Sequence, residues 1–235
     1  MAVVADRWLR YNGLMPAGQT GYINVYLLDD HDIVRQGLRD LLAPARDVHV
    51  VGDSGLARSA ADSIVRLKTH VMVLDLQLQD GNGVRVCRQV RSVDPSIKGI
   101  LLTSSDDDDA LAAAVLAGAD GCLVKLTRSS DILQAVRAVG AGGTLIDEPL
   151  AARAAGHLRA RAQALVPALS EEETELLELV LAGQTDQQIA EHRGLEVTAI
   201  HPDVAALTDR ILSATTPSSS PTGDIASGGK HRRTL

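Results

Sequence analysis

The sequence is poor in aromatic residues: phenylalanine is absent, and aromatics make up only 2% of 235 residues. Because 45% of the residues are hydrophobic, the core must be built from aliphatic side chains. The two cysteines, Cys87 and Cys122, form no CxxC pair and lie in apolar segments. They predict small core residues, exclude a disulfide framework and fit a reducing cytoplasm. No apolar run reaches the roughly 20 residues of a membrane span.

The chain also lacks an excess of basic residues. Its net charge is -7, so we expect no general attraction to polyanions, and contact with nucleic acid would need a local basic patch. The seven histidines show no metal-ligand spacing. Residues 1–22 lack the continuous apolar segment of a signal peptide, and their three glycines and Pro16 predict a disordered extension in which Met15 is an alternative start.

Residues 23–145 alternate between two periodicities. Short apolar runs, which predict buried parallel strands, alternate with amphipathic segments, which predict helices. The expected strands are 23–28, 48–52, 71–75, 97–105 and 121–125, and the expected helices are 32–42, 57–67, 84–90, 106–116 and 130–139. This alternation indicates an α/β, flavodoxin-like domain with a doubly wound parallel sheet in the strand order 2-1-3-4-5.

Carboxylates follow the two strands that flank the reversal of this strand order. Asp29 and Asp30 come directly after the first strand, and Asp75 ends the third. Ligands bind at the carboxyl ends of strands at such a point. Taken alone, Asp75 is equally compatible with a helix cap and with a reactive group.

Clustered carboxylates repel one another unless a cation or a proton intervenes, and Mg²⁺ prefers such oxygen ligands. Thr103 and Lys125 end the fourth and fifth strands on the same rim. A hydroxyl, an ammonium group and a divalent cation around one carboxylate indicate phosphoryl transfer. Asp75 would be the nucleophile and would form an aspartyl phosphate.

The order and positions of five residues resemble the receiver domain of two-component response regulators: Asp29, Asp30, Asp75, Thr103 and Lys125. The segments DDHDIVRQGLRDLL and QDGNGVRVCRQV resemble the NarL/LuxR-type, DosR-like subfamily. The resemblance implies that a sensor histidine kinase phosphorylates Asp75. It implies that Mg²⁺ is held by Asp29, Asp30, Asp75 and the Gln77 carbonyl, that Thr103 shifts toward the phosphoryl group, and that Lys125 pairs with it.

Two positions depart from the family pattern. Gln79 stands where the family usually has proline, and Cys122 stands where it has an aromatic switch residue in the fifth strand. A small side chain cannot move between exposed and buried positions as a ring does. An aspartyl-phosphate hydrolase of the haloacid-dehalogenase type is a competing interpretation. That class requires a second aspartate where this chain has Gln77.

A run of four aspartates, residues 106–109, suggests a metal site at first sight. Acids at the start of a helix are stabilised by the helix dipole, by roughly 0.3–1 kcal/mol each. We therefore interpret the run as the N-terminus of a helix.

The second half of the chain predicts a smaller, all-α domain. Residues 146–168 are rich in alanine and arginine and predict a linker with one helix. Residues 169–212 contain two capping-box spacings, Ser170 with Glu173 and Thr185 with Gln188, and glycine turns typical of a helix-turn-helix domain. Residues 213–235 predict a disordered tail that carries a small basic cluster, residues 230–233.

Residues 169–190 resemble the signature of the NarL/LuxR output domain at Leu169, Glu173, Glu175, Leu177, Gly183, Thr185, Ile189 and Ala190. The resemblance implies DNA contacts from Thr198, Ala199, His201 and Arg210, with His201 at the place of the family's lysine. Pro202 follows it and costs about 3 kcal/mol inside a helix. We therefore expect the recognition helix to start near Pro202 or to be kinked there.

Charge sets two functions against each other. Residues 166–213 contain two basic residues, Arg193 and Arg210, against ten acids, at 171, 172, 173, 175, 178, 186, 191, 196, 203 and 209. Lysine and arginine contacts to phosphate supply most non-specific DNA affinity. The leading hypothesis is a non-enzymatic, cytoplasmic, homodimeric response regulator of transcription. The alternative is a regulator that has lost DNA binding and acts through other proteins.

Overall fold

The computed structural model describes residues 22–105, 107–125, 129–165 and 167–213. The extension predicted for residues 1–22 lies outside this range apart from Tyr22, and so does the predicted tail beyond Ser213. Within the described part of the chain, no helix is both long and apolar enough to cross a membrane.

Five strands form one parallel sheet: β1 (Ile23–Leu28), β2 (Val48–Ser54), β3 (Val71–Asp75), β6 (Lys98–Thr103) and β7 (Gly121–Val124). Their order is β2-β1-β3-β6-β7, which confirms the predicted doubly wound sheet. A two-stranded hairpin, β4 (Gln77–Leu78) and β5 (Gly81–Asn82), follows β3 where the sequence indicated only a polar turn.

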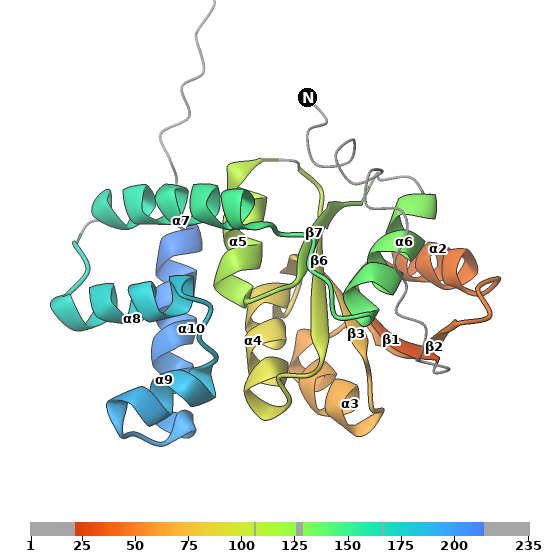
Figure 1. Cartoon of the computed structure of the whole chain (residues 1–235), viewed down its shortest axis with the longest axis horizontal. Helices are drawn as coiled ribbons and strands as arrows, with labels where there is room; N and C mark the ends of the chain where they lie inside the picture. Colours follow the sequence, from red (N-terminus) through yellow and green to blue (C-terminus); the bar gives the residue numbers. More distant parts are fainter. Residues whose placement is uncertain (1–21, 106, 126–128, 166, 214–235) are drawn as a thin grey trace, which may run out of the picture.

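Helices cover both faces of the sheet (Figure 1). On one face lie α2 (Asp32–Leu42) and α6 (Ser129–Gly140), whose apolar side chains pack with those of the sheet in one core cluster. On the other face lie the short helix η1 (Ala57–Ser59), α3 (Ala60–Arg66), α4 (Gly83–Val93) and α5 (Asp108–Ala117). The helices predicted from the amphipathic spacing all form, with ends that differ by a few residues.

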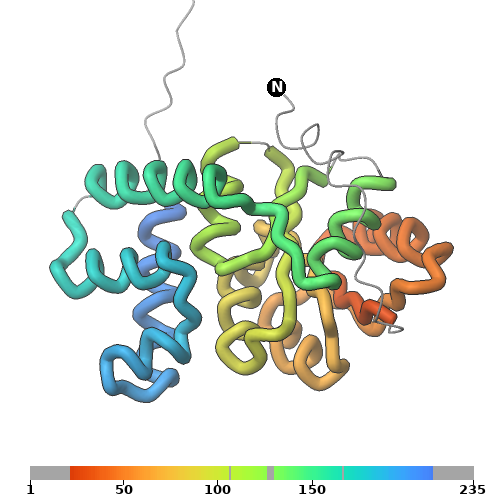
Figure 2. The backbone as a smooth tube through the Cα atoms, viewed as in Figure 1, coloured from red at the N-terminus to blue at the C-terminus, as the bar shows by residue number. Residues whose placement is uncertain are grey.

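The second half of the chain forms α7 (Glu148–Gln163), α8 (Glu171–Leu181), α9 (Asp186–Arg193) and α10 (Val197–Ser213). Both capping boxes are present: Ser170 with Glu173 starts α8, and Thr185 with Gln188 starts α9. Gly194 adopts a left-handed φ of 65° and ends α9, a conformation that glycine takes without steric cost. These helices pack beside α4 and α5 (Figure 2).

Pro202 lies inside α10, so the expectation that this helix starts near Pro202 is wrong. The helix begins at Val197. Side chains spaced three or four residues apart are buried along one face of α10: Ile200, Val204, Leu207 and Ile211. Burying each stabilises the fold by about 1.5–3 kcal/mol, which together outweighs the roughly 3 kcal/mol that proline costs.

Helix α5 is buried on nearly all sides. Its sequence is rich in alanine, and seven of its ten residues are buried: Ala110, Leu111, Ala112, Ala113, Ala114, Leu116 and Ala117. A helix that is apolar all round must be covered on every side. The sheet covers one side of α5, and α7, α8 and α10 contact the other. One hydrophobic cluster therefore runs from the sheet through α5 into the C-terminal helices α7 to α10, called the output helices below.

We expect Leu158→Ala to destabilise both halves of the molecule together. Leu158, in α7, is fully buried in the shared cluster, and removing such a side chain costs about 2–5 kcal/mol. Chemical denaturation followed by circular dichroism should show one transition at lower denaturant. Leu195→Ala, at a half-exposed position, serves as the control and should change the free energy of unfolding by about 0.5 kcal/mol or less. A loss confined to a separate second transition would contradict the shared core.

Candidate functional site

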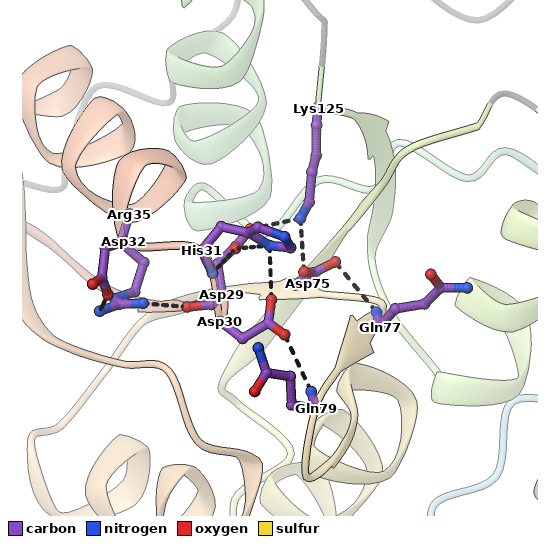
Figure 3. Close-up of polar contacts among 9 residues, drawn as sticks. All are labelled: Asp29, Asp30, His31, Asp32, Arg35, Asp75, Gln77, Gln79 and Lys125. Carbon is purple, nitrogen blue, oxygen red and sulfur yellow. Dashed lines mark hydrogen bonds and ion pairs between the residues drawn. The ribbon is translucent and has the colours of Figure 1, made fainter.

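The predicted acidic residues and the lysine lie at one edge of the sheet (Figure 3). Asp29 and Asp30 directly follow β1, Asp75 ends β3, and Lys125 directly follows β7. The parallel register keeps these strand ends level, since Leu28 pairs with Leu74. The carboxyl ends of three strands thus deliver these four side chains to one pocket.

Lys125 bridges two of the carboxylates. Its Nζ lies 2.7 Å from Asp75 Oδ2 and 2.8 Å from Asp29 Oδ2. Both aspartates are buried. The ammonium group therefore compensates two negative charges from the solvent side of the pocket.

Gly83 allows α4 to start against the end of β3. A Cβ atom at this position would lie 2.3 Å from the backbone oxygen of Asp75, closer than any real contact. The hairpin between them places the backbone N–H of Gln77 3.2 Å from Asp75 Oδ1, to which it donates a hydrogen bond. The backbone N–H of Gln79 donates to Asp30 Oδ2, also at 3.2 Å. The departure from the family's proline at Gln79 thus supplies a backbone donor to Asp30.

Thr103 is buried at the end of β6, on the same rim. Its hydroxyl oxygen accepts a hydrogen bond from the backbone N–H of Ser105 at 3.2 Å. Cys122, at the place of the family's aromatic residue, is partly exposed, and its Sγ lies 3.7 Å from the backbone oxygen of Ala110 in α5. Cys87, by contrast, is fully buried, and burial raises the pKa of its thiol to about 12.

Burial raises the pKa of Asp75, and the nearby charge of Asp29 adds to the rise, although the hydrogen bond from Lys125 opposes it. For Lys125, burial lowers the pKa, but the hydrogen bonds to Asp29 and Asp75 outweigh it and leave the pKa raised. The pocket therefore keeps its lysine charged, while ionising Asp75 costs more than in water.

The residues present fit a bound divalent cation. Lys125 pairs with Asp29 and Asp75, and Asp30 adds a third carboxylate to the same cluster. Asp30 Oδ1 is buried and accepts no hydrogen bond from any described residue. One atom each from Asp29, Asp30, His31 and Asp75 lie within 4.8 Å of one another. His31 was not among the residues that the sequence indicated, although it directly follows the aspartate pair.

A buried ion pair joins the two halves of the molecule. Arg88 projects from α4, and its Nε donates to Asp186 Oδ1 at 2.9 Å, at the start of α9. Its Nη1 donates to the backbone oxygen of Leu116 in α5 at 2.8 Å. The two side chains are only 7% and 2% exposed. Asp186 Oδ2 also lies 2.5 Å from Nδ1 of His201 in α10. This cluster was not predicted from the sequence, although an arginine beside the apolar face of a predicted helix is a signal.

The aspartate run at the start of α5 does more than begin a helix. Asp107 caps α5, accepting a hydrogen bond from the backbone N–H of Ala110, as interpreted from the sequence. Asp108 and Asp109 reach to α7, where Asp108 pairs with Arg153 at 3.1 Å and Asp109 with His157 at 2.6 Å and with Arg161. Asp106 lies outside the described residues. Burial raises the pKa of Asp109, but the hydrogen bonds from Arg161 and His157 outweigh it and leave the pKa lowered.

The four residues expected to contact DNA do not share one exposed surface. Thr198 and Ala199 are exposed in the first turn of α10. His201 faces Asp186. Arg210 pairs with Glu173 and donates to the backbone oxygen of Pro167 at 3.0 Å. The two side chains able to carry positive charge are thus engaged within the molecule.

The acidic pocket at the end of a doubly wound parallel sheet defines a receiver domain. The response regulator receiver domain family matches residues 25–137. The DNA-binding transcriptional activator DevR/DosR of Mycobacterium tuberculosis is 39% identical over 171 residues, which cover 72% of this chain and 79% of that protein. The response regulator protein VraR of Staphylococcus aureus is 29% identical, over 80% of this chain and 90% of that protein.

The chain therefore belongs to the two-component response regulators of the NarL/LuxR type, as the resemblance indicated. Among solved structures, a LuxR-family two-component response regulator from Aurantimonas sp. SI85-9A1 superposes with a TM-score of 0.52 and 26% identity. The superposition covers 58% of this chain and 98% of the Aurantimonas chain. DevR/DosR is described as a transcriptional activator, and transcriptional activators are not enzymes.

We expect Asp75→Asn to raise the melting temperature at pH 7. The raised pKa of Asp75 means that its charged form is disfavoured in the folded state, and the amide removes that cost while Lys125 keeps Asp29 as a partner. In a chain of this size each kcal/mol of stabilisation raises the melting temperature by about 2–4 °C.

The gain should shrink as the pH falls through the raised pKa, because Asp75 is then neutral in the wild type as well. Differential scanning calorimetry across the acidic range measures it. Asp40→Asn, which replaces an exposed carboxylate of α2, is the control. A lower melting temperature for Asp75→Asn at pH 7 would show that the ion pair with Lys125 is net stabilising.

Proposed function

We propose that this response regulator accepts a phosphoryl group on Asp75 from a sensor histidine kinase and passes the signal to a LuxR-type DNA-binding domain formed by α8 to α10. The observation that carries the proposal is the geometry of Lys125, which holds Asp75 and Asp29 together at the carboxyl edge of the sheet. A cytoplasmic location follows from this role, since the kinase's phosphodonor domain and the DNA would both be met there.

Phosphoryl transfer needs an available lone pair on one carboxylate oxygen of Asp75. An oxygen of Asp75 would form a bond to phosphorus while the bond from phosphorus to the donor breaks, and the donor's leaving group takes the electron pair. Lys125 lies 2.7 Å from Asp75 Oδ2 and would then pair with the transferred group. The Thr103 hydroxyl, on the neighbouring strand end, is the proposed hydrogen-bond donor to that group.

Mg²⁺ is the proposed cation of the pocket. Asp29, Asp30 and Asp75, together with the carbonyl of Gln77, would hold it, and it would supply positive charge next to the transferred phosphoryl group. The Oδ1 atom of Asp30 supports this assignment, because it is buried and accepts no hydrogen bond from a described residue.

The output half, α7 to α10, is proposed to bind DNA as a homodimer. In the structure described here α9 packs against α4, and we call this the closed arrangement; DNA binding would follow its opening. DevR/DosR, the 39% identical relative, is described as a DNA-binding transcriptional activator, which supports a DNA-binding role. In the closed arrangement His201 faces the buried Asp186, which Arg88 holds from the receiver. Thr198, Ala199, His201 and Arg210 stay the proposed contacts, and release of His201 would accompany separation of α9 from α4.

The second candidate function is a regulator that acts through other proteins and not through DNA. The acidic output half and the internal pairing of Arg210 with Glu173 favour it, because few cations are left to meet phosphates. Both candidates share the same phosphoryl-acceptor site and differ only in the partner of α8 to α10.

We expect acetyl phosphate with Mg²⁺ to label the protein on one residue. Asp75→Asn should abolish the label, because the amide cannot act as the nucleophile. Intact-mass spectrometry, which detects one added phosphoryl group per chain, measures it. Asp40→Asn, an exposed carboxylate of α2, should be labelled as the wild type is. Full labelling of Asp75→Asn would refute the site.

We expect Arg88→Ala to bind DNA more tightly than the unphosphorylated wild type. The substitution leaves Asp186 buried without its arginine, and removing one partner of a buried pair costs about 3–5 kcal/mol, so the closed arrangement loses its advantage. Fluorescence anisotropy with genomic fragments at low salt, with and without acetyl phosphate, measures the affinity.

Arg85→Ala is the matched control for this measurement. Arg85 lies on the same helix, and its contact with Asp209 is 3.6 Å long and exposed, so its loss should matter little. Absence of DNA binding by the wild type in either phosphorylation state and by Arg88→Ala would exclude the DNA-binding role. The protein-binding alternative would then stand.

A further inference from the structure

His31 lies at the mouth of the acidic pocket. Its backbone N–H donates to Asp29 Oδ1 at 2.8 Å, which turns the chain directly after the aspartate pair. The ring then lies over the pocket, with Nδ1 2.8 Å from Asp30 Oδ1 and 3.3 Å from Asp29 Oδ1. Figure 3 shows the ring turned toward these two carboxylates. A ring nitrogen therefore lies beside the carboxylate oxygens of the proposed cation site.

A second observation points to a ligand that the ring and the carboxylates share. The side chain of Asp30 is only 10% exposed, and its Oδ1 atom accepts no hydrogen bond from any described residue, although His31 Nδ1 is 2.8 Å away. The ring nitrogen of His31 and the Oδ1 atom of Asp30 do not share a hydrogen bond. At this distance they are spaced as two neighbouring ligands of one metal ion are. Together with Asp29 and Asp75 they give three oxygens and one nitrogen within 4.8 Å.

We propose that His31 is a nitrogen ligand of this pocket and that it makes the pocket prefer a first-row transition-metal dication to Mg²⁺. Mg²⁺ takes oxygen ligands, whereas imidazole nitrogen suits softer dications, whose affinities for mixed nitrogen and oxygen sites rise from Mn²⁺ through Co²⁺. The ring is 67% exposed, so it can adjust its position to complete the coordination sphere alongside water. The inference rests on the proposed function, because it assigns a fourth ligand to the same cation site.

The test uses Co²⁺ as the probe, because its visible absorption changes when nitrogen replaces oxygen as a ligand. The full-length protein is stripped of metal with a chelator and titrated with Co²⁺ and, separately, with Mg²⁺ by calorimetry. The wild type should bind one Co²⁺ at least about tenfold more tightly than Mg²⁺. His31→Ala should lower the ratio of Co²⁺ to Mg²⁺ affinity by about tenfold or more, the scale on which changes to a metal's surroundings act.

His31→Gln, which offers an oxygen in place of the nitrogen, should show the same loss and a Co²⁺ spectrum typical of oxygen ligands only. His192→Ala, an exposed histidine of α9, is the control and should keep the wild-type ratio and spectrum. Equal affinities of the wild type for Co²⁺ and Mg²⁺, or an unchanged spectrum in His31→Gln, would overturn the inference about His31 alone. Labelling of Asp75 with acetyl phosphate and Mg²⁺ would still support the proposed function.

Discussion

The burial of α5 between the sheet and the output helices is the constraint on which the arrangement of this protein depends. A helix of ten residues with seven buried cannot be satisfied by the sheet alone. Its alanines let α7 and α10 approach closely, and in its first turn Asp108 and Asp109 pair with Arg153, His157 and Arg161 of α7. The C-terminal end of α5 receives Arg88, whose other contacts reach α9. Both ends and one side of this helix are therefore in contact with the output half or linked to it through Arg88.

The same helix begins close to the proposed phosphoryl-acceptor site. Thr103 ends the strand that leads into α5, and Ser105, which donates to its hydroxyl oxygen, also hydrogen-bonds the capping residue Asp107. A change at the site that moved Thr103 would pull on the start of α5. Cys122 stands where the family has an aromatic residue, and its Sγ lies 3.7 Å from a backbone oxygen of α5. The contacts from Thr103 to Asp107 offer a route from the acidic site to the output half that needs no aromatic side chain.

The fold and the acidic pocket could be predicted because their signals are local. Each strand carries its own apolar run, each carboxylate directly follows a strand, and topology brings strand ends together. Arg88 and Asp186 could not be paired in advance, because they are 98 positions apart and their meeting depends on how two units pack. The continuous α10 was missed for a related reason. The cost of Pro202 can be predicted from the local sequence. The burial of Ile200, Val204 and Ile211 that offsets this cost depends on tertiary packing.

The shared core has an evolutionary consequence. Receivers and output domains are often treated as interchangeable modules joined by a linker. Here helix α5 must fit the sheet on one side and α7, α8 and α10 on the other, so a substitution that shifts this helix changes both sets of contacts. The two halves are thus expected to change in concert along a lineage. A chimera that joins this receiver to a relative's output helices would inherit a mismatched surface along the whole length of α5.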